Sequence, residues 1–171
     1  DEDRKALDTV ERYNIETKTW SRLPKMPTKR FGCAAGVVGN KIYVVGGEDY
    51  DDNELSTTDV FNLSELQWES QDERDAPASL PPVAKMKENR GMLSVVAVDR
   101  FIVAIGGGDE DGNLLSTIEV LDTTRNIWVY APTRMPQGNC YTAAGLLKGT
   151  NEILVAGGAN EEEVNVTSNV D

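Results

Sequence analysis

Three short apolar runs without polar alternation recur along the chain, and each ends in a pair of glycines. They cover residues 42–45, 102–105 and 153–156. An uninterrupted apolar run of this length is typical of a β-strand covered on both faces. The double glycine indicates a backbone that needs unusual dihedral angles or lies close to a neighbouring segment. We therefore predict three buried strands, each ending at a tight corner.

The segments around these runs repeat as well. A stretch of mostly small or β-branched residues precedes each run, at residues 30–38, 90–97 and 139–147. The first two double glycines are followed by an acidic loop and a strand with an acidic residue, and a tryptophan comes nine residues after that acidic residue. The N-terminal part, from Asp8 to Trp20, repeats this second half with no double glycine before it. Each full unit therefore contains four short strands.

The spacing of the units reveals one insertion. The double glycines lie 60 and 51 residues apart, and the tryptophans lie 48 and 60 residues apart. Trp68 is 22 residues before Arg90, whereas Trp20 is only 10 residues before Arg30. The extra residues fall between 69 and 89 and are rich in proline and charge, so we predict an irregular surface loop there.

The repeated motif resembles the kelch repeat. Besides the double glycine, each unit has an aromatic or large apolar residue seven positions before its tryptophan: Tyr13, Phe61 and Leu121. Three matches in register cover essentially the whole chain, and kelch repeats of about 50 residues form four-stranded blades of a β-propeller around a central channel. The resemblance therefore implies an all-β fold, a kelch-type β-propeller segment of four-stranded antiparallel blades.

The repeat boundaries divide residues 1–171 into parts of one propeller segment. They are half a blade (1–23), a blade with the insertion 69–89 (24–88), a second blade (89–133) and an incomplete blade (134–171). This is about three blades, whereas propellers have about four to eight. Either the chain is a piece of a six- or seven-bladed propeller, or a second copy or another polypeptide completes its ring.

We favour the piece, because residues 8–11 and 168–171 match the same strand position and would compete for one place in a closed ring. In both cases the open ends expose apolar faces and unpaired strand edges, through which the chain can self-associate.

Composition restricts the partners and the compartment. The formal charge of −12 argues against nucleic acid or an anionic membrane as the main partner. No apolar run is long enough for a transmembrane helix, so we expect a protein or peptide partner. Cys33 and Cys140 fall two blades apart and predict no disulfide, which favours a reducing, cytoplasmic location. The sequons at Asn62 and Asn165 would matter only in a secreted protein.

Catalytic chemistry finds little support in the sequence. The chain has no histidine, so it lacks the usual base near neutral pH and a common metal ligand. The glycines at 106–108 lack dinucleotide-binding spacing. The acidic loop that starts at Asp109 has Val120 where a calcium loop needs glutamate. We therefore predict no catalytic residue, no cofactor and no metal site in this chain.

Geometry indicates one candidate binding face. In a four-stranded blade, the loop entering the first strand and the loop between the second and third strands open on the same side. This face would carry six candidate residues: Arg30, Arg90, Asn139, Tyr50, Asp109 and Asn113.

The resemblance suggests what this face binds. In kelch adaptors of cullin-type ubiquitin ligases, an arginine matching Arg30 and Arg90 lies by the pore and helps to hold acidic peptides, since its fork pairs with carboxylates. Asn139 departs from this pattern. The acidic loops would repel an acidic peptide, so a partner of mixed charge or with hydroxyl groups is equally compatible. In the alternative interpretation, the two arginines only neutralise neighbouring loop carboxylates.

The sequence thus favours a protein-interaction module, acting as a scaffold or recognising substrates for a ubiquitin-ligase-type adaptor. One alternative is a propeller enzyme (an oxidase, isomerase or hydrolase) whose active centre lies in blades outside this chain. Another is extracellular carbohydrate or adhesive binding, which an exposed Tyr50 and occupied sequons would favour.

Overall fold

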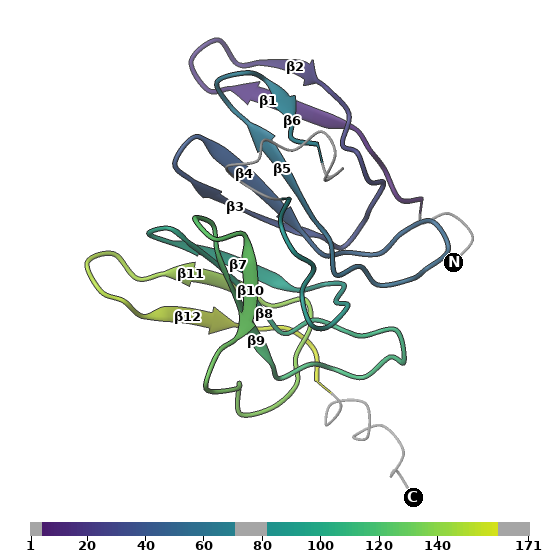
Figure 1. The fold of residues 1–171 in the computed structure, drawn as a ribbon, viewed down its shortest axis with the longest axis vertical. Helices are drawn as coiled ribbons and strands as arrows, with labels where there is room; N and C mark the ends of the chain where they lie inside the picture. Colours follow the sequence, from purple (N-terminus) through teal and green to yellow (C-terminus); the bar gives the residue numbers. More distant parts are fainter. Residues whose placement is uncertain (1–4, 71–81, 161–171) are drawn as a thin grey trace, which may run out of the picture.

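The predicted all-β architecture is confirmed. The structure is a computed structural model that describes residues 5–70 and 82–160. Within these residues all regular secondary structure is β-strand, arranged as four antiparallel sheets along an arc (Figure 1). Residues 71–81, the centre of the predicted insertion, lie outside the described residues, as does the sequon at Asn165.

Two complete blades form the middle of the arc. In both sheets the strands are hydrogen-bonded in chain order. The first sheet contains β3 (Ala34–Val38), β4 (Lys41–Val45), β5 (Thr58–Asn62) and β6 (Gln67–Trp68). The second contains β7 (Ser94–Val98), β8 (Phe101–Ile105), β9 (Ile118–Asp122) and β10 (Ile127–Tyr130).

A two-stranded sheet lies at each end of the arc (Figure 1). The N-terminal sheet contains β1 (Val10–Asn14) and β2 (Thr19–Leu23). The C-terminal sheet contains β11 (Ala143–Leu146) and β12 (Ile153–Ala156). Of the three predicted buried strands, β4 and β8 are largely buried. The third strand, β12, is partly exposed, and Leu154 in it is 57% exposed. The reason is that no described strand pairs with the outer edge of β12.

The double glycines form the predicted tight corners between blades. Gly106 and Gly107 adopt φ angles of 61° and 101°, in the left-handed region. The Gly107 N–H donates a 2.9 Å hydrogen bond to the carbonyl of Asn139 in the next blade. A Cβ atom on Gly106 would lie 2.5 Å from that same carbonyl oxygen. The corner therefore needs glycine both for its dihedral angle and for the close approach.

Substituting two equivalent glycines separates these requirements. Gly157 has nearly the same φ as Gly106, 68°, but a Cβ there would meet nothing within 4 Å. Gly157→Ala should lower the free energy of unfolding by about 1 kcal/mol through left-handed strain alone. Gly106→Ala should cost about 2 kcal/mol more because of the clash. Urea unfolding of both variants gives the comparison, and equal losses would show that the close approach is absent.

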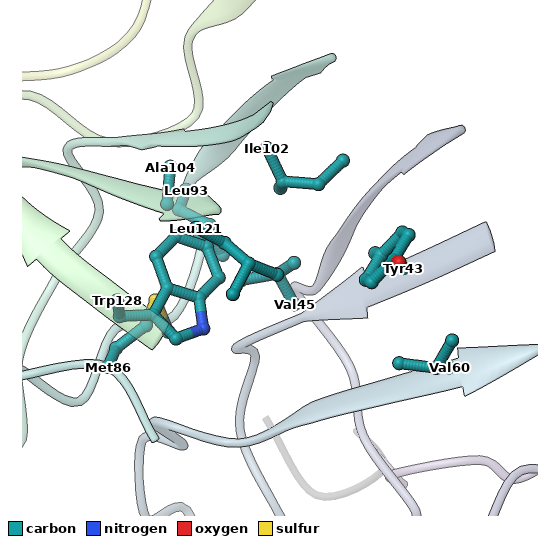
Figure 2. Close-up of a cluster of buried hydrophobic side chains, with 9 residues drawn as sticks. All are labelled: Tyr43, Val45, Val60, Met86, Leu93, Ile102, Ala104, Leu121 and Trp128. Atoms are coloured by element: carbon teal, nitrogen blue, oxygen red, sulfur yellow. The ribbon is translucent and has the colours of Figure 1, made fainter. Parts of the chain in front are cut away.

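The main hydrophobic core lies between the two complete blades. Figure 2 shows Tyr43, Val45 and Val60 of the first blade facing Ile102, Leu121 and Trp128 of the second. Met86, from the segment that joins the blades, closes the cluster beside the tryptophan. A second cluster, centred on Val96, Val103 and Ile105, packs against residues of β11 and β12. Stability therefore comes from packing one blade on the next, as in repeat proteins.

Candidate partner-binding face

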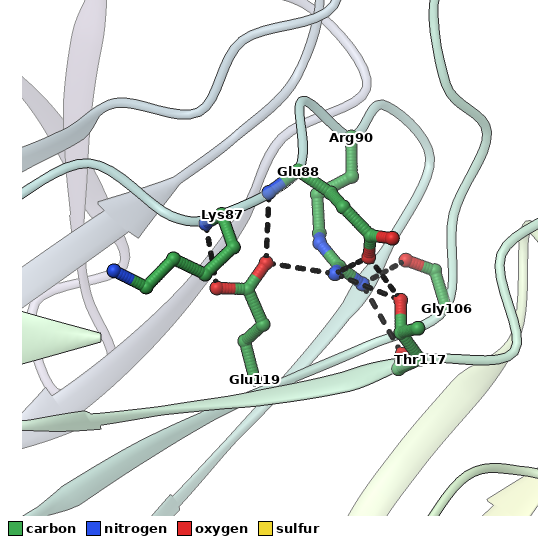
Figure 3. Close-up of polar contacts among 6 residues, drawn as sticks. All are labelled: Lys87, Glu88, Arg90, Gly106, Thr117 and Glu119. Carbon is green, nitrogen blue, oxygen red and sulfur yellow. Dashed lines mark hydrogen bonds and ion pairs between the residues drawn. The ribbon is translucent and has the colours of Figure 1, made fainter. Parts of the chain in front are cut away.

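Arg90 is a fully buried residue of the second blade, with 0% of its surface exposed. Its Nη1 donates to the carbonyl oxygens of Gly106 (2.8 Å) and Thr117 (3.2 Å). Its Nη2 contacts the carboxylates of Glu119 and Glu88, both at 2.9 Å (Figure 3). Through these hydrogen bonds and ion pairs, the guanidinium group connects the glycine corner after β8 to the third strand, β9.

Arg30 makes the same contacts in the first blade. It is 3% exposed, and its Nη1 donates to the Gly46 carbonyl at 2.7 Å. Its Nη2 donates to Asp59 Oδ2 at 2.8 Å. Asp59 is itself 1% exposed. The arginine clamp, by which we mean Arg30 with Asp59 and Arg90 with Glu119, is thus a repeated buried ion pair.

The placement of these two arginines differs from the sequence prediction. Both guanidinium groups are buried and use their Nη atoms inside their own blades, so neither presents a fork to an acidic peptide. The Nε atoms of both arginines are buried without a hydrogen-bond partner among the described residues. Both arginines pair with a third-strand acid, and Arg90 also pairs with a loop carboxylate, that of Glu88, as the alternative interpretation expected. Each arginine precedes its acidic partner by 29 residues, and this constant spacing is the sequence signal that predicts the pair.

The acidic loops are held by internal hydrogen bonds. Asp49 Oδ1 accepts the backbone N–H groups of Asp51 (2.8 Å) and Asn53 (3.0 Å) and the Asn53 side-chain amide (3.1 Å). The backbone and side-chain bonds from Asn53 hold the pKa of Asp49 below its usual value. The same bonds join Asp109 and Asn113 in the second blade. These two predicted face residues therefore contact each other and shape their loop.

The two acidic loops lie close enough to interact electrostatically. The pKa of Glu54 is raised, first by burial and then by the charges of Asp109, Glu110 and Asp52. The loops also start beside the entries to the first strands, since Phe31 N–H donates to the carbonyl of Glu48 at 3.0 Å. This arrangement agrees with the predicted common side for the two kinds of loop. We call residues 48–54 and 109–113 together the loop face.

The remaining two candidates have different environments. Tyr50 is 66% exposed in the first acidic loop, where its side chain is accessible to a partner. Asn139 is half-buried, and its backbone bonds to Gly107 (2.9 Å) and Leu115 (3.3 Å) join it to the second blade. Asn139 occupies the repeat position of Arg30 and Arg90, so the third unit lacks the arginine of the clamp.

The two cysteines of the chain lie in surroundings that disfavour reactivity. The thiols of Cys33 and Cys140 are free, and burial raises the pKa of both. A raised pKa disfavours the reactive thiolate. Among the residues that the structure describes, no three potential ligand side chains cluster as a metal site would require. The described part of the chain also contains no helix capable of crossing a membrane.

The family model of the KLHDC2/KLHL20/DRC7 Kelch-repeats domain matches this chain over residues 1–171. The chain belongs to the kelch-repeat family. Kelch-like protein 33 of Homo sapiens is 30% identical over 149 residues, which are 84% of this chain and 25% of that protein. Kelch-like protein terF of Aspergillus terreus is 30% identical over 152 residues, 85% of this chain and 30% of that protein.

A third kelch relative extends the comparison. Kelch domain-containing protein 8B of Mus musculus is 33% identical over 160 residues, 89% of this chain and 42% of that protein. The chain therefore spans less than half the length of each of these kelch relatives. Membership of the family confirms the resemblance found in the repeats, and it supports a protein-interaction module.

Proposed function

We propose that this kelch segment is a protein-interaction module whose loop face binds a partner segment rich in basic side chains. The observation that carries the proposal is the separation of charge. The two arginines near the loop face are neutralised inside the blades, whereas Asp51, Asp52 and Asp111 are exposed on its loops. A negative surface attracts basic partners and repels acidic ones.

Peptide binding to two charge-matched variants tests this proposal. The face variant carries Asp51→Asn, Asp52→Asn, Glu110→Gln and Asp111→Asn. The control variant removes the same charge from exposed residues near the hairpin turns at the opposite ends of the strands: Glu16→Gln, Glu65→Gln, Asp99→Asn and Glu152→Gln. The probe is a fluorescent peptide of alternating lysine and serine, compared with one of alternating glutamate and serine.

We expect the chain to bind the lysine peptide more tightly than the glutamate peptide at low salt. Each exposed charge contact contributes about 0.3–0.5 kcal/mol, so losing four should weaken binding roughly tenfold in the face variant. The control variant, compared at about 0.15 M salt where the Debye length is about 8 Å, should change the affinity less than about twofold, since strands of four or five residues separate its substitutions from the loop face. Equal affinities of the two variants, or preference for the glutamate peptide, would contradict the proposal.

A finer role is substrate recognition for a ubiquitin ligase. It is supported by the resemblance to kelch adaptors and not by a contact within this chain. Its test is whether a cullin co-purifies with the full-length protein, and whether the proteins that the loop face captures are ubiquitinated in its presence. Capture without cullin association would leave a scaffold role.

A further inference from the structure

The outer edge of the second complete blade is apolar. β10 is the last strand of its sheet, so its outer side has no neighbouring strand among the described residues. Val129 and Tyr130 in β10 are 50% and 49% exposed. Because the fourth strand of a blade lies on the circumference of a propeller, further blades in the ring would leave its outer edge uncovered. The exposure of this edge therefore does not depend on how many blades the ring has.

The same two positions are polar in the other units. They are Ser21 and Arg22 in β2, and Glu69 and Ser70 after β6. β6 itself ends at Trp68, after only two residues. Very short strands and charged side chains are common means by which proteins prevent an edge strand from pairing with another chain. β10 has neither of these protections, so its outer edge is the one suited to pairing.

Two residues of β10 direct their backbone groups outward. The Ala131 N–H donates to the carbonyl of Ile118 in β9 at 2.8 Å. Backbone groups alternate in direction along an antiparallel strand, so Val129 also faces β9, whereas Trp128 and Tyr130 face away from it. No described strand pairs with these outward N–H and C=O groups. They form one open side of a hydrogen-bond ladder, to which an extended segment can add a strand.

Side chains on both faces of the blade lie beside this open edge. Trp128 is buried in the core between the two complete blades. Tyr130 lies on the same side of β10 as Trp128, and Val129 lies on the opposite side, because side chains alternate along a strand. An apolar or β-branched residue of an added strand would therefore pack against Tyr130 or Val129, as cross-strand pairs do.

Four exposed bases surround the outer edge of β10: Lys85, Lys87, Arg125 and Arg134. Arg125 lies two residues before β10, and Arg134 lies four residues after it. The segment that carries the lysines runs beside the same blade, because the Ala84 N–H donates to the carbonyl of Asn126 at 3.0 Å. None of the four side chains forms an ion pair within the described residues. Figure 3 shows the Lys87 ammonium group directed away from the neighbouring Glu88 carboxylate.

The carboxylates near this edge are already paired. Glu88 and Glu119 contact Arg90 at 2.9 Å, and Asp122 contacts Arg100 at 3.4 Å. Although the whole chain has a net charge of −12, the surroundings of β10 therefore present uncompensated positive charge. Such a surface attracts acidic segments, and it would repel the same edge of a second copy.

We propose that the outer edge of β10 is a second protein-binding site, at which an extended segment of a partner adds a fifth strand to the second blade. The segment has an apolar or β-branched centre beside Val129 and Tyr130, and acidic residues that face the four bases. Backbone hydrogen bonds to Trp128 and Tyr130 hold the segment, and its side chains determine specificity. This site is separate from the loop face, which takes basic segments.

Peptide binding to two matched variants tests the proposal. The probe is a fluorescent peptide in which two glutamates precede and two follow a Val-Thr-Val-Thr centre, and its control has lysines in place of the glutamates. The edge variant, Val129→Glu with Tyr130→Ser, gives β10 the side chains that the first blade has at these positions. The control variant, Leu63→Glu with Leu66→Ser, makes the same change of charge at side chains that are 40% and 41% exposed in another turn.

We expect the glutamate peptide to bind more tightly than the lysine peptide at about 0.15 M salt. The edge variant should bind the glutamate peptide about tenfold more weakly, and the control variant should change the affinity less than about twofold. All four substitutions are at exposed positions, and urea unfolding checks that both variants are folded. Equal affinities of the two variants, or equal binding of the two peptides, would overturn the proposal.

Failure of this proposal can be told apart from failure of the loop-face proposal. The edge variant retains every residue of the loop face, so it should bind the alternating lysine and serine peptide as the unmodified chain does. Loss of that binding in the edge variant would overturn the separation of the two sites.

Hydrogen exchange tests whether the peptide adds a strand or binds through its charge alone. With saturating glutamate peptide, the backbone N–H groups of Trp128 and Tyr130 should exchange at least about tenfold more slowly, because they become hydrogen-bonded. The equivalent groups of Trp20 and Arg22 in β2 provide the control and should not change. Binding of the peptide without slower exchange at Trp128 and Tyr130 would overturn the added strand.

Discussion

Replacing Arg90 with alanine is expected to lower the free energy of unfolding by about 3–5 kcal/mol, because removing one partner of a buried ion pair leaves the other charge uncompensated. Glu119 is 0% exposed and would lose its 2.9 Å contact with the guanidinium. The carbonyl of Gly106 would lose its 2.8 Å hydrogen bond at the same time. Urea unfolding followed by tryptophan fluorescence measures the loss.

Two further variants isolate the cause. Arg22 is an exposed arginine 3.9 Å from Glu11, and Arg22→Ala should cost less than about 1 kcal/mol. The double variant Arg90→Met with Glu119→Leu removes both buried charges, and apolar replacements of a buried pair are often neutral. It should recover only part of the stability, because the N–H groups of Lys87 and Glu88, which donate to Glu119 at 2.7 and 3.1 Å, lose their acceptor. If Arg90→Ala cost no more than Arg22→Ala, the guanidinium would be solvated, and a partner-binding role for Arg90 would regain support.

The repeat pattern predicted the strand order because every structural position occurs in several copies. The apolar runs gave β4, β8 and β12, and the tryptophans marked β2, β6 and β10. The double glycines marked the corners, where φ is positive and where, at every one of these glycines except Gly157, a Cβ would lie 2.5 Å from a backbone oxygen. These features depend on local sequence, so they could be recognised without the structure.

The direction of a long side chain could not be predicted in the same way. Arg30 and Arg90 begin the segments that lead into the first strands, as predicted, but their guanidinium groups turn inward toward the third strands. That direction depends on which residue of the third strand lies beside the arginine, and this residue comes 29 positions later in the chain. The repeat position of each arginine therefore predicted where its backbone lies, but not the direction in which its guanidinium group points.

Burial at the ends of the arc was a second feature that the pattern alone could not give. The run at residues 153–156 has the same apolar character as those at 42–45 and 102–105, yet its strand is partly exposed. Burial depends on the next strand and the next blade, which for β12 are not among the described residues. The apolar pattern thus predicts which strands are suited to burial, whereas the structure shows which of them neighbouring strands bury.

Trp128→Ala is expected to cost about 3–5 kcal/mol, because a large buried side chain leaves a cavity that its neighbours fill only in part. Trp128 is 1% exposed and packs with Leu121 and Met86 in the core between the blades (Figure 2). Its indole N–H has no hydrogen-bond partner among the described residues. Trp128→Phe should therefore cost much less than alanine, and a similar loss for both would contradict a purely apolar role.

Trp20 provides the matched control, since it occupies the same repeat position but is 68% exposed. Trp20→Ala should change the free energy of unfolding by less than about 0.5 kcal/mol, because little of its surface is buried. A loss as large as that of Trp128→Ala would show that Trp20 is covered in solution.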